Sequence, residues 1–233
     1  MKIRFLNLLL AGSIVISIML SGCKKDDNTP LNDNDTSTNN GTLKDNRDGK
    51  TYKWVKIGNQ IWMAENLNYT GSDIQHITDK TEWENNSNYD GWCYYENNED
   101  FGKTYGVLYQ WEAAKKACPE GWHLPSYAEW NTLKTYLGTN AGSKLAGNAA
   151  LWTDGALDQN ADFGSSGFSA LPGGFITYDS NFSDIGNSCF WWSATNTDNY
   201  HACLFGLEYD ETECGGDSSG TKPAGLYVRC VKD

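Results

Sequence analysis

Residues 105–138 have the most regular spacing of apolar and polar positions in the chain. In the second half of this block, apolar side chains recur at the spacing of one helical face, at Trp130, Leu133 and Leu137. Ser126 and Glu129 have the Ser-x-x-Glu spacing of a capping box, which satisfies two backbone N–H groups at a helix start. Gly138 can adopt the left-handed conformation that ends a helix. The pattern therefore predicts a helix that starts at Ser126 and stops at Gly138.

A second, less regular helix is predicted over residues 108–118. Trp111, Ala114 and Cys118 can share one face of it, and two lysines near its end suit the negative pole of the helix dipole. Pro119 prevents the helix from continuing. We expect the rest of the chain, which is aromatic and rich in glycine, to pack against these two helices.

Apolar runs on both sides of the helices predict strands. Residues 51–64 have the pattern of a hairpin around a Gly-Asn turn, a favoured two-residue connection. Residues 189–195 are strongly apolar, and a turn after them would place Trp192 opposite Cys203 on the next strand. A final strand is predicted over residues 225–231.

The segment between the hairpin and the helices, residues 70–89, is polar and irregular and is typical of a long surface loop. Most tryptophans lie in predicted strands and helices, where burial in the core is the default. Four aromatic residues lie in or beside the loop instead. They are the candidates for an exposed ligand-binding surface: Trp83, Tyr89, Tyr94 and Tyr95.

The start of the chain resembles the signal of a bacterial lipoprotein. Residues 1–22 combine a basic start with a short apolar run and small residues before Cys23. We expect Cys23 to be acylated and to anchor the protein to a membrane. Residues 23–43 are polar and have no apolar period, so they predict a flexible tether. The charged residues after Cys23 resemble those of exposed Bacteroidetes lipoproteins, which implies an outer-membrane location facing the cell exterior.

The predicted folded domain covers residues 44–233, a length that suits one domain. The whole chain carries a formal net charge of -12. This charge opposes binding to nucleic acid, so we expect no nucleic-acid partner. The expected partners are the membrane, through the lipid anchor, and a glycan or a surface protein.

Six cysteines remain when Cys23 is set aside for the lipid. An even number in an exported chain favours disulfide bonds, although spacing alone does not determine their connectivity. A zinc site is the alternative. It is disfavoured because no cysteine pair has Cys-x-x-Cys spacing and the histidines do not cluster with cysteines.

Several sequence blocks, in order, resemble a known family, the Fibrobacter succinogenes major paralogous domain. The blocks are DGKTYKWVKIGNQIWMAENLNY, YGVLYQWEAAKKACPEGWHLPSYAEWNTL, GFSALPGG, WWSAT and YVRCVKD. The family occurs in lipoproteins and large surface proteins, and its molecular function is not established. A more distant resemblance, to the C-type lectin fold, implies an α+β domain. Two helices would pack on short, mostly antiparallel, twisted sheets with long loops.

The C-type lectin resemblance also implies that Cys118, on the first helix, pairs with Cys230, on the last strand. A local bridge between Cys203 and Cys214 is a further expectation. Family members often carry a second cysteine shortly after the position of Cys93, and this chain has none there. The partner of Cys93 therefore stays open.

The favoured expectation is that the protein has no cofactor. Calcium is the one alternative that the sequence allows. The carbohydrate-binding motifs of C-type lectins, Glu-Pro-Asn or Gln-Pro-Asp followed by Trp-Asn-Asp, are missing from the chain. Asp158, Asn160 and Asp162 place oxygen side chains at alternate positions, as calcium loops do. The glycine of this segment is one place late and Ser169 stands where a glutamate is needed, so a solvated acidic loop is favoured over a metal site.

No catalytic residue is expected. The architecture resembles that of formylglycine-generating enzymes, but nothing marks a cysteine as a reactive nucleophile, and the common hydrolase motifs are missing. His123 is interpreted as a turn residue. The favoured function is non-enzymatic recognition of a glycan or a protein at the cell surface. The alternative is a structural or assembly subunit of an adhesion or pilus complex, and an enzyme is the third possibility.

Overall fold

The capping box predicted from the sequence begins helix α4 (Tyr127–Leu137). The Ser126 side chain accepts from the backbone N–H of Glu129, and the Glu129 carboxylate accepts from the N–H of Ser126 at 2.7 Å. Trp130 and Leu133 on the inner face are fully buried. Gly138 follows the helix with a φ of 69°. The prediction for this helix is confirmed.

The computed structural model describes residues 38–215 and 219–233. The expected signal peptide (1–22), the expected lipid site Cys23 and residues 24–37 of the expected tether lie outside the described residues. No helix among the described residues is both long and apolar enough to cross a membrane. The description below concerns the unit formed by residues 37–233.

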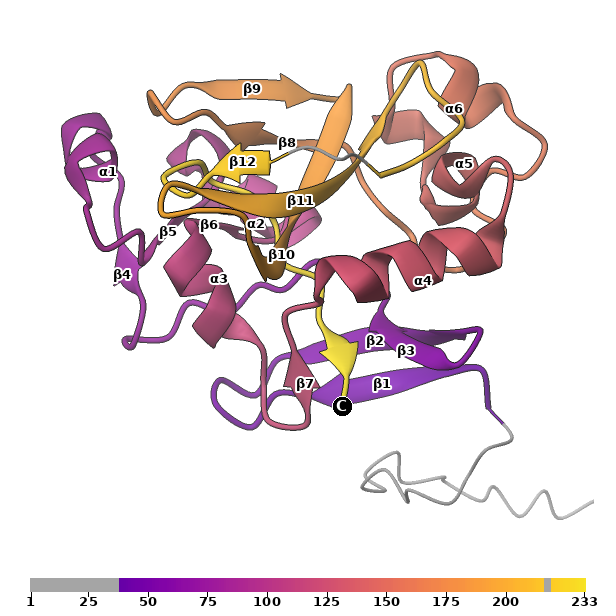
Figure 1. Cartoon of the computed structure of the whole chain (residues 1–233), viewed down its shortest axis with the longest axis horizontal. Coiled ribbons are helices and arrows are strands. Elements are labelled where there is room, and N and C mark those ends of the chain that lie inside the picture. Colours follow the sequence, from indigo (N-terminus) through magenta and orange to yellow (C-terminus); the bar gives the residue numbers. More distant parts are fainter. Residues whose placement is uncertain (1–37, 216–218) are drawn as a thin grey trace, which may run out of the picture. The chain divides into compact units, whose positions relative to one another are not determined.

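The first sheet joins the beginning and the end of this unit. Its strand order is β1-β2-β3-β13-β7. Its strands are β1 (Asn40–Lys44), β2 (Thr51–Ile57), β3 (Gln60–Met63), β7 (Trp122–His123) and β13 (Val231–Lys232). Val231 pairs with Trp62 on one side and with His123 on the other, so β13 lies between β3 and β7 (Figure 1). The hairpin β2–β3 confirms the prediction for residues 51–64.

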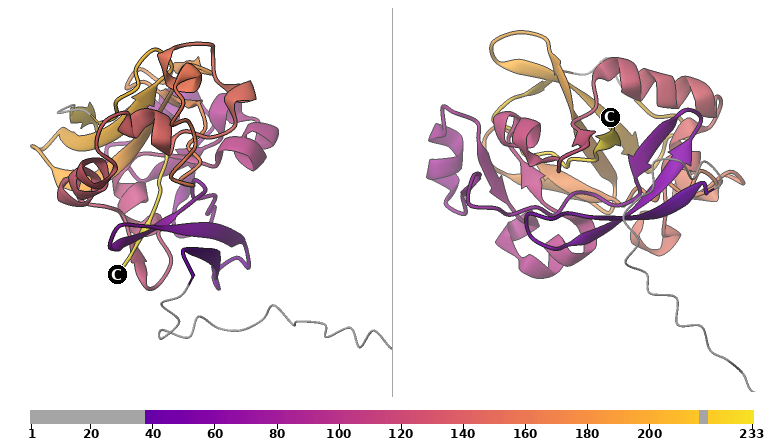
Figure 2. Two further views of the ribbon diagram at one scale, coloured as in Figure 1. Left: turned by 90° about the vertical axis from the view of Figure 1, so that its right-hand side faces the viewer. Right: turned by 90° about the horizontal axis from the view of Figure 1, so that it is seen from below.

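β1 corrects the predicted start of the domain. It pairs with β2 from Asn40 onward, and Leu43 within it is buried. The folded part therefore begins inside the segment expected to be a tether, before residue 44. Seen from below, β1–β3 extend across one side of the domain (Figure 2). β1 is an edge strand of the first sheet.

The second sheet is formed by the C-terminal third of the chain and has the order β12-β11-β10-β8-β9. Its strands are β8 (Gly173–Ile176), β9 (Phe182–Ile185), β10 (Ser188–Asn196), β11 (His201–Glu208) and β12 (Ser219–Thr221). Trp192 pairs with Leu204, not with Cys203 as predicted. The strands nearest the turn pair Asn196 with Ala202, not Thr195 with Tyr200 as the prediction assumed, and a register irregularity lies between Trp192 and Asn196.

The third sheet has the order β4-β5-β6 and is formed by β4 (Gln75–His76), β5 (Gly91–Cys93) and β6 (Leu108–Tyr109). The remaining helices are α1 (Lys80–Asn85), α2 (Glu99–Tyr105), α3 (Trp111–Ala117), α5 (Ala141–Leu145) and α6 (Ala156–Gln159). Two short 3₁₀ helices, η1 (Tyr95–Asn97) and η2 (Ala149–Leu151), complete the described elements.

Two sequence predictions for local structure are corrected. The first predicted helix begins at Trp111 instead of residue 108, because Leu108 and Tyr109 form β6 and Tyr109 exchanges backbone hydrogen bonds with Leu226. The predicted loop 70–89 contains β4 and helix α1. α1 is too short to show a helical period, and its one buried side chain is Trp83.

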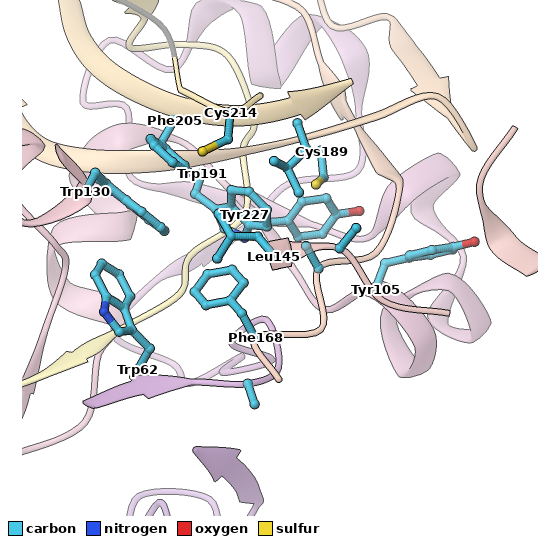
Figure 3. Packing of buried hydrophobic residues seen from close by; sticks show 14 of the residues in the cluster. Trp62, Tyr105, Trp130, Leu145, Phe168, Cys189, Trp191, Phe205, Cys214 and Tyr227 are labelled. Carbon is cyan, nitrogen blue, oxygen red and sulfur yellow. The ribbon is translucent and has the colours of Figure 1, made fainter. Parts of the chain in front are cut away.

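Trp130 of α4 connects the first and second sheets. Its ring lies 4.5 Å from Trp62 on β3 and is stacked 4.6 Å from Phe205 on β11, measured between ring centroids. Trp191 and Phe168 extend this aromatic cluster (Figure 3). The tryptophans that were assigned to the core are all buried: Trp54, Trp62, Trp111, Trp130, Trp152, Trp191 and Trp192. The α+β class is confirmed, and most of the described strand pairs are antiparallel.

Candidate functional site

A cleft with a volume of about 780 Å³ lies beside β1 and β2. Its other walls come from the segment after β3, from the end of α2 and from the loop before β8. The residues that line it are Asn40, Gly41, Thr42, Lys50, Thr51, Tyr52, Lys53, Trp54, Val55, Ala64, Glu65, Asn66, Asn68, Gly102, Lys103, Thr104, Tyr105, Gly106, Gly167, Ser169, Leu171 and Arg229. The site thus combines residues from the start of the domain (40–68) with residues 102–106, residues 167–171 and Arg229.

Arg229 is the buried charge of the cleft, with 1% of its surface exposed. Its Nε and Nη2 atoms donate to Asn66 Oδ1 at 3.1 and 2.9 Å. Its Nη1 atom donates to the carbonyl of Phe168, and the guanidinium carbon lies 4.2 Å from the centre of the Phe168 ring. No ion pair of Arg229 occurs within the described residues. The guanidinium is therefore held by neutral oxygens and aromatic faces.

Burial lowers the pKa of the Arg229 guanidinium to about 9. The charges of Cys189 and Glu65 act in the opposite direction and raise this pKa, but they do not outweigh burial. A cation removed from water is costly unless neighbouring dipoles or charges replace its hydration. Asn66 supplies much of this replacement, and it also accepts from Trp191 Nε1 at 2.8 Å and donates to the Tyr105 carbonyl at 2.8 Å. Asn66 therefore connects β10, the end of α2 and the final segment of the chain.

The wall of the cleft beside α2 is polar. Asn68 donates to the Gly102 carbonyl at 3.0 Å, and its backbone N–H donates to the hydroxyl of Tyr52 at 3.2 Å. Lys50 donates to the carbonyl of Asn68. Within the part of the chain that the structure describes, Asn68 Oδ1 and Trp54 Nε1 are buried atoms without a hydrogen-bond partner. The fold therefore leaves polar groups unused along this wall.

The strand wall presents Lys53, which is exposed and makes no ion pair within residues 38–215 and 219–233. Side chains alternate along β2, so Tyr52 and Trp54 are buried on the opposite face from Lys53. The Glu65 carboxylate accepts from the backbone N–H of Lys53 at 2.8 Å. These contacts fix the position of the strand while the Lys53 ammonium stays in solvent.

The structure does not bring the four predicted aromatic ligand residues into this cleft. Trp83 is 2% exposed and donates to the Pro223 carbonyl at 2.9 Å, and Tyr95 is 4% exposed in the main core. Tyr89 and Tyr94 are half-buried. The expectation of an exposed aromatic surface is wrong for Trp83 and Tyr95, because each packs inward from a short element that sequence periodicity does not reveal.

The three residues of the acidic loop use their oxygens within the fold. Asp158 accepts from the backbone N–H of Gly155 at 2.8 Å, at the start of α6. Asn160 accepts from the N–H of Asp162 at 2.9 Å, and Asp162 accepts from the side chain of Asn140 at 3.2 Å. Among the described residues, no group of three or more His, Cys, Asp or Glu side chains is arranged to hold a metal ion.

Cys118 and Cys230 form a disulfide with their Cα atoms 5.9 Å apart, which confirms the pairing implied by the resemblance. Cys203 and Cys214 are free, so the expected local bridge is wrong. The backbone beside Cys214 bonds to Gly206, because Gly215 N–H donates to its carbonyl at 3.1 Å. Cys203 lies three residues further along β11, about 10 Å away, and a disulfide needs its Cα atoms within about 7 Å.

His123 lies outside the cleft and is held between two carboxylates. Its Nδ1 is 2.6 Å from Asp233 and its Nε2 is 2.8 Å from Glu129. Partial burial lowers the pKa of His123, but the hydrogen bonds with Asp233 and Glu129 outweigh burial and raise it above its ordinary value. The side chain thus joins β7, the first turn of α4 and Asp233. His123 is therefore a strand residue, and its interpretation as a turn residue is wrong.

Asn66, Lys53 and Arg229 were not singled out by sequence reasoning. One signal was present for Arg229, a single charge within the apolar run of the last predicted strand. A charge at such a position usually has a dedicated set of partners. Nothing in the sequence marks Asn66 or the Phe168 carbonyl as those partners, because they are separated from Arg229 by 163 and 61 residues.

Comparison with known proteins gives a family match. Neither a search of curated proteins nor a search of solved structures finds a significant similarity. The C-type-lectin-like part of the fold prediction therefore stays a prediction. The family model of the Fibrobacter succinogenes major domain matches residues 55–232, which include the end of β2, the elements from β3 through β13 and most of the cleft. The chain belongs to the Fibrobacter succinogenes major domain family.

Proposed function

We propose that this protein is a recognition module that binds a saccharide in the cleft beside β1 and β2, without chemical change to it. The observation that carries the proposal is the composition of the cleft. Its volume of about 780 Å³ is within the range of small-ligand sites, and hydroxyl and amide side chains line it: Asn40, Thr42, Thr51, Asn66, Asn68, Thr104 and Ser169. These groups can donate to and accept from sugar hydroxyls.

The rigidity of the lining supports binding with little ordering cost. Tyr52, Trp54 and Tyr105 are each less than 10% exposed, so the strand and helix walls rest on packed aromatic side chains. Asn66 and Asn68 tie the segment after β3 to the end of α2 through the carbonyls of Tyr105 and Gly102. A preorganised site loses less conformational entropy when a ligand binds.

The proposal includes an anchored, exported protein. The lipoprotein-like start of the sequence supports a lipid on Cys23 and display on the outer face of the outer membrane. A recognition domain on a tether would then meet glycans of the surroundings.

A glycan array probed with the purified full-length protein tests the function. Thr42 is exposed on β1 and lines the cleft, so Thr42→Trp should obstruct it while keeping a residue that strands accept. Lys44→Trp is the matched control, because Lys44 is exposed two residues later on the same strand and does not line the cleft. We expect the Thr42 variant to lose array binding and the Lys44 variant to keep it. Failure of the wild-type protein to bind any saccharide would refute the proposal.

A second candidate function, an assembly subunit of a surface complex, is favoured by a different feature. β1 is an edge strand and forms the rim of the cleft. Edge strands offer unpaired backbone groups that can take up a strand from another chain. Pull-down of a surface protein that is lost in an Asn40→Pro variant, together with no binding to the array, would favour this function over saccharide recognition.

A further inference from the structure

The cleft differs in charge from the protein that contains it. The chain has a net charge of -12, yet four of the charged residues that line the cleft are cationic (Lys50, Lys53, Lys103 and Arg229) and one is anionic (Glu65). We infer that the cleft selects an acidic saccharide, with the carboxylate of a uronic acid placed near Lys53, Lys103 and Arg229. This inference rests on the proposed function and names the class of ligand that the cleft binds.

The lysines at the rim differ in their partners. Lys50 lies 3.5 Å from the Asp48 carboxylate and Lys103 lies 2.8 Å from that of Asp100, with both lysine side chains more than one third exposed. Exposed pairs of this kind are weak and exchange readily with solvent, so a competing anion displaces them at small cost. Lys53 has no ion pair among the described residues and is the rim cation most available to a ligand.

Arg229 adds a fixed positive charge below the rim. Its hydrogen bonds go to Asn66 and to the carbonyls of Phe168 and Ser169, all neutral groups. Glu65 is the carboxylate whose charge acts to raise the pKa of Arg229. Charge in a poorly hydrated setting acts over a longer distance than charge in water, so Arg229 favours an anion in the cleft even without direct contact.

The same features argue against a polyanion such as nucleic acid. The positive charge is confined to one cleft, and the rest of the surface repels a long negatively charged chain. The hydroxyl and amide side chains around the cations suit a ligand whose acidic group is surrounded by hydroxyls, as in a uronic acid.

The test uses three uronic-acid oligosaccharides, from polygalacturonate, alginate and cellouronate. The affinity of each is compared with the affinity of the same oligosaccharide after its carboxylates are reduced to hydroxymethyl groups. A sulfated galactan and its desulfated form make a separate pair. We expect at least one uronic acid to bind about tenfold more tightly than its reduced form, and the difference to shrink at high salt. Equal affinity for both members of every pair, or preference for the sulfated galactan alone, would overturn the inference.

The variants use exposed lysines, so that loss of binding does not come from unfolding. Lys53→Gln combined with Lys103→Gln should weaken the acidic ligand about fivefold or more, and the reduced ligand little. Lys56→Gln is the control, because Lys56 is on β2 but does not line the cleft. If the protein binds neutral saccharides and shows no preference for acidic ones, this inference is refuted and the proposed function is not. If it binds no saccharide at all, both are refuted.

Discussion

Arg229 donates two hydrogen bonds to a single oxygen of Asn66, from Nε at 3.1 Å and from Nη2 at 2.9 Å. The two residues are 163 positions apart in sequence, and Trp191 donates to the same oxygen. A neutral amide thus takes the place that a carboxylate usually has beside a buried arginine. The arrangement keeps the positive charge of Arg229 uncompensated next to the cleft.

Replacement of Asn66 should therefore be costly. Asn66→Ala removes the acceptor of Arg229 and Trp191 and leaves buried donors without partners, so we expect a loss of about 3 kcal/mol in the free energy of unfolding. Urea denaturation measures it. Asn88→Ala, at an exposed position, should change the free energy by less than about 0.5 kcal/mol. A loss below about 1 kcal/mol for Asn66→Ala would show that Arg229 finds another acceptor.

The disulfide should contribute strongly to stability. It closes a loop with a sequence separation of 112 residues, and a constraint of this length on the unfolded chain is worth about 5 kcal/mol in the chain-entropy model. The double variant Cys118→Ala, Cys230→Ala should therefore unfold at a clearly lower urea concentration without reductant. Cys203→Ala, which removes a free and half-buried thiol, is the control. Equal midpoints for the double variant and the wild type would contradict the prediction.

The free thiols should differ in reactivity. Burial raises the pKa values of all four free thiols, but Cys93, Cys189 and Cys214 are buried whereas Cys203 is half-buried and open to a reagent. Because thiolate is the reactive form, iodoacetamide should modify Cys203 first in the folded protein and all four thiols in denaturant. Mass spectrometry of the labelled peptides gives the order. If Cys203 and Cys214 both stay unlabelled in denaturant until a reductant is added, they are bonded to each other and the description of free thiols is wrong.

His123 and Glu129 predict a pH range of full stability for the contact between β7 and α4. The pKa of His123 is raised, so its contribution is complete below its ordinary value of 6.5 and is lost as the pH rises through the raised pKa. Burial raises the pKa of Glu129, but hydrogen bonds with Ser126 and His123 outweigh it, and the pKa is lowered. Its contribution is complete above 4.5 and is lost as the pH falls through the lowered pKa. Both contributions are complete between pH 4.5 and 6.5.

The pH prediction is checked by the free energy of unfolding of the wild type and of His123→Gln, measured from below pH 4.5 to above neutrality. The contact is half exposed, so we expect a difference of less than about 1 kcal/mol, largest at mildly acidic pH and smaller above neutrality. His201→Gln, which removes an exposed histidine beside Asp198, is the matched control. Parallel curves for the wild type and His123→Gln would show that the pKa of His123 is the same in the folded and unfolded protein, which contradicts the prediction.

The proposed lipid anchor makes a prediction outside the described residues. Metabolic labelling with a palmitate analogue should mark the wild-type protein and should be lost in Cys23→Ala. The variant should also leave the membrane fraction. Label that persists in Cys23→Ala would place the acyl group elsewhere and remove the basis for surface anchoring.

Local features were predictable from sequence where one segment contains the whole cause. The capping box of Ser126 and Glu129 lies within the first turn of α4, so its residues needed no distant partner. The hairpin β2–β3 is likewise set by its own turn. The start of the first predicted helix was missed because Tyr109 bonds to Leu226, which only the folded chain brings beside it.

The cleft could not be predicted, because its chemistry depends on residues that meet only through the fold. Lys53 lies on β2, Asn66 follows β3, and Arg229 comes just before β13. Trp83 shows the reverse case. It was expected to be exposed in a polar loop, but its indole donates to the Pro223 carbonyl and packs in the core. Polarity of the neighbouring sequence says little about one side chain that crosses to a distant segment.

The bond between Cys118 and Cys230 also determines how the domain would carry mechanical load. If the chain is pulled at Asn40 and Asp233, tension passes through the disulfide and bypasses the residues between the two cysteines. The two cysteines are separated by 112 residues, so the bond prevents about 400 Å of chain from being extended. Helix α4, the whole second sheet and Arg229 lie in this part of the chain. Under this pull the part of the domain that can extend is the chain before Cys118, from β1 through α3.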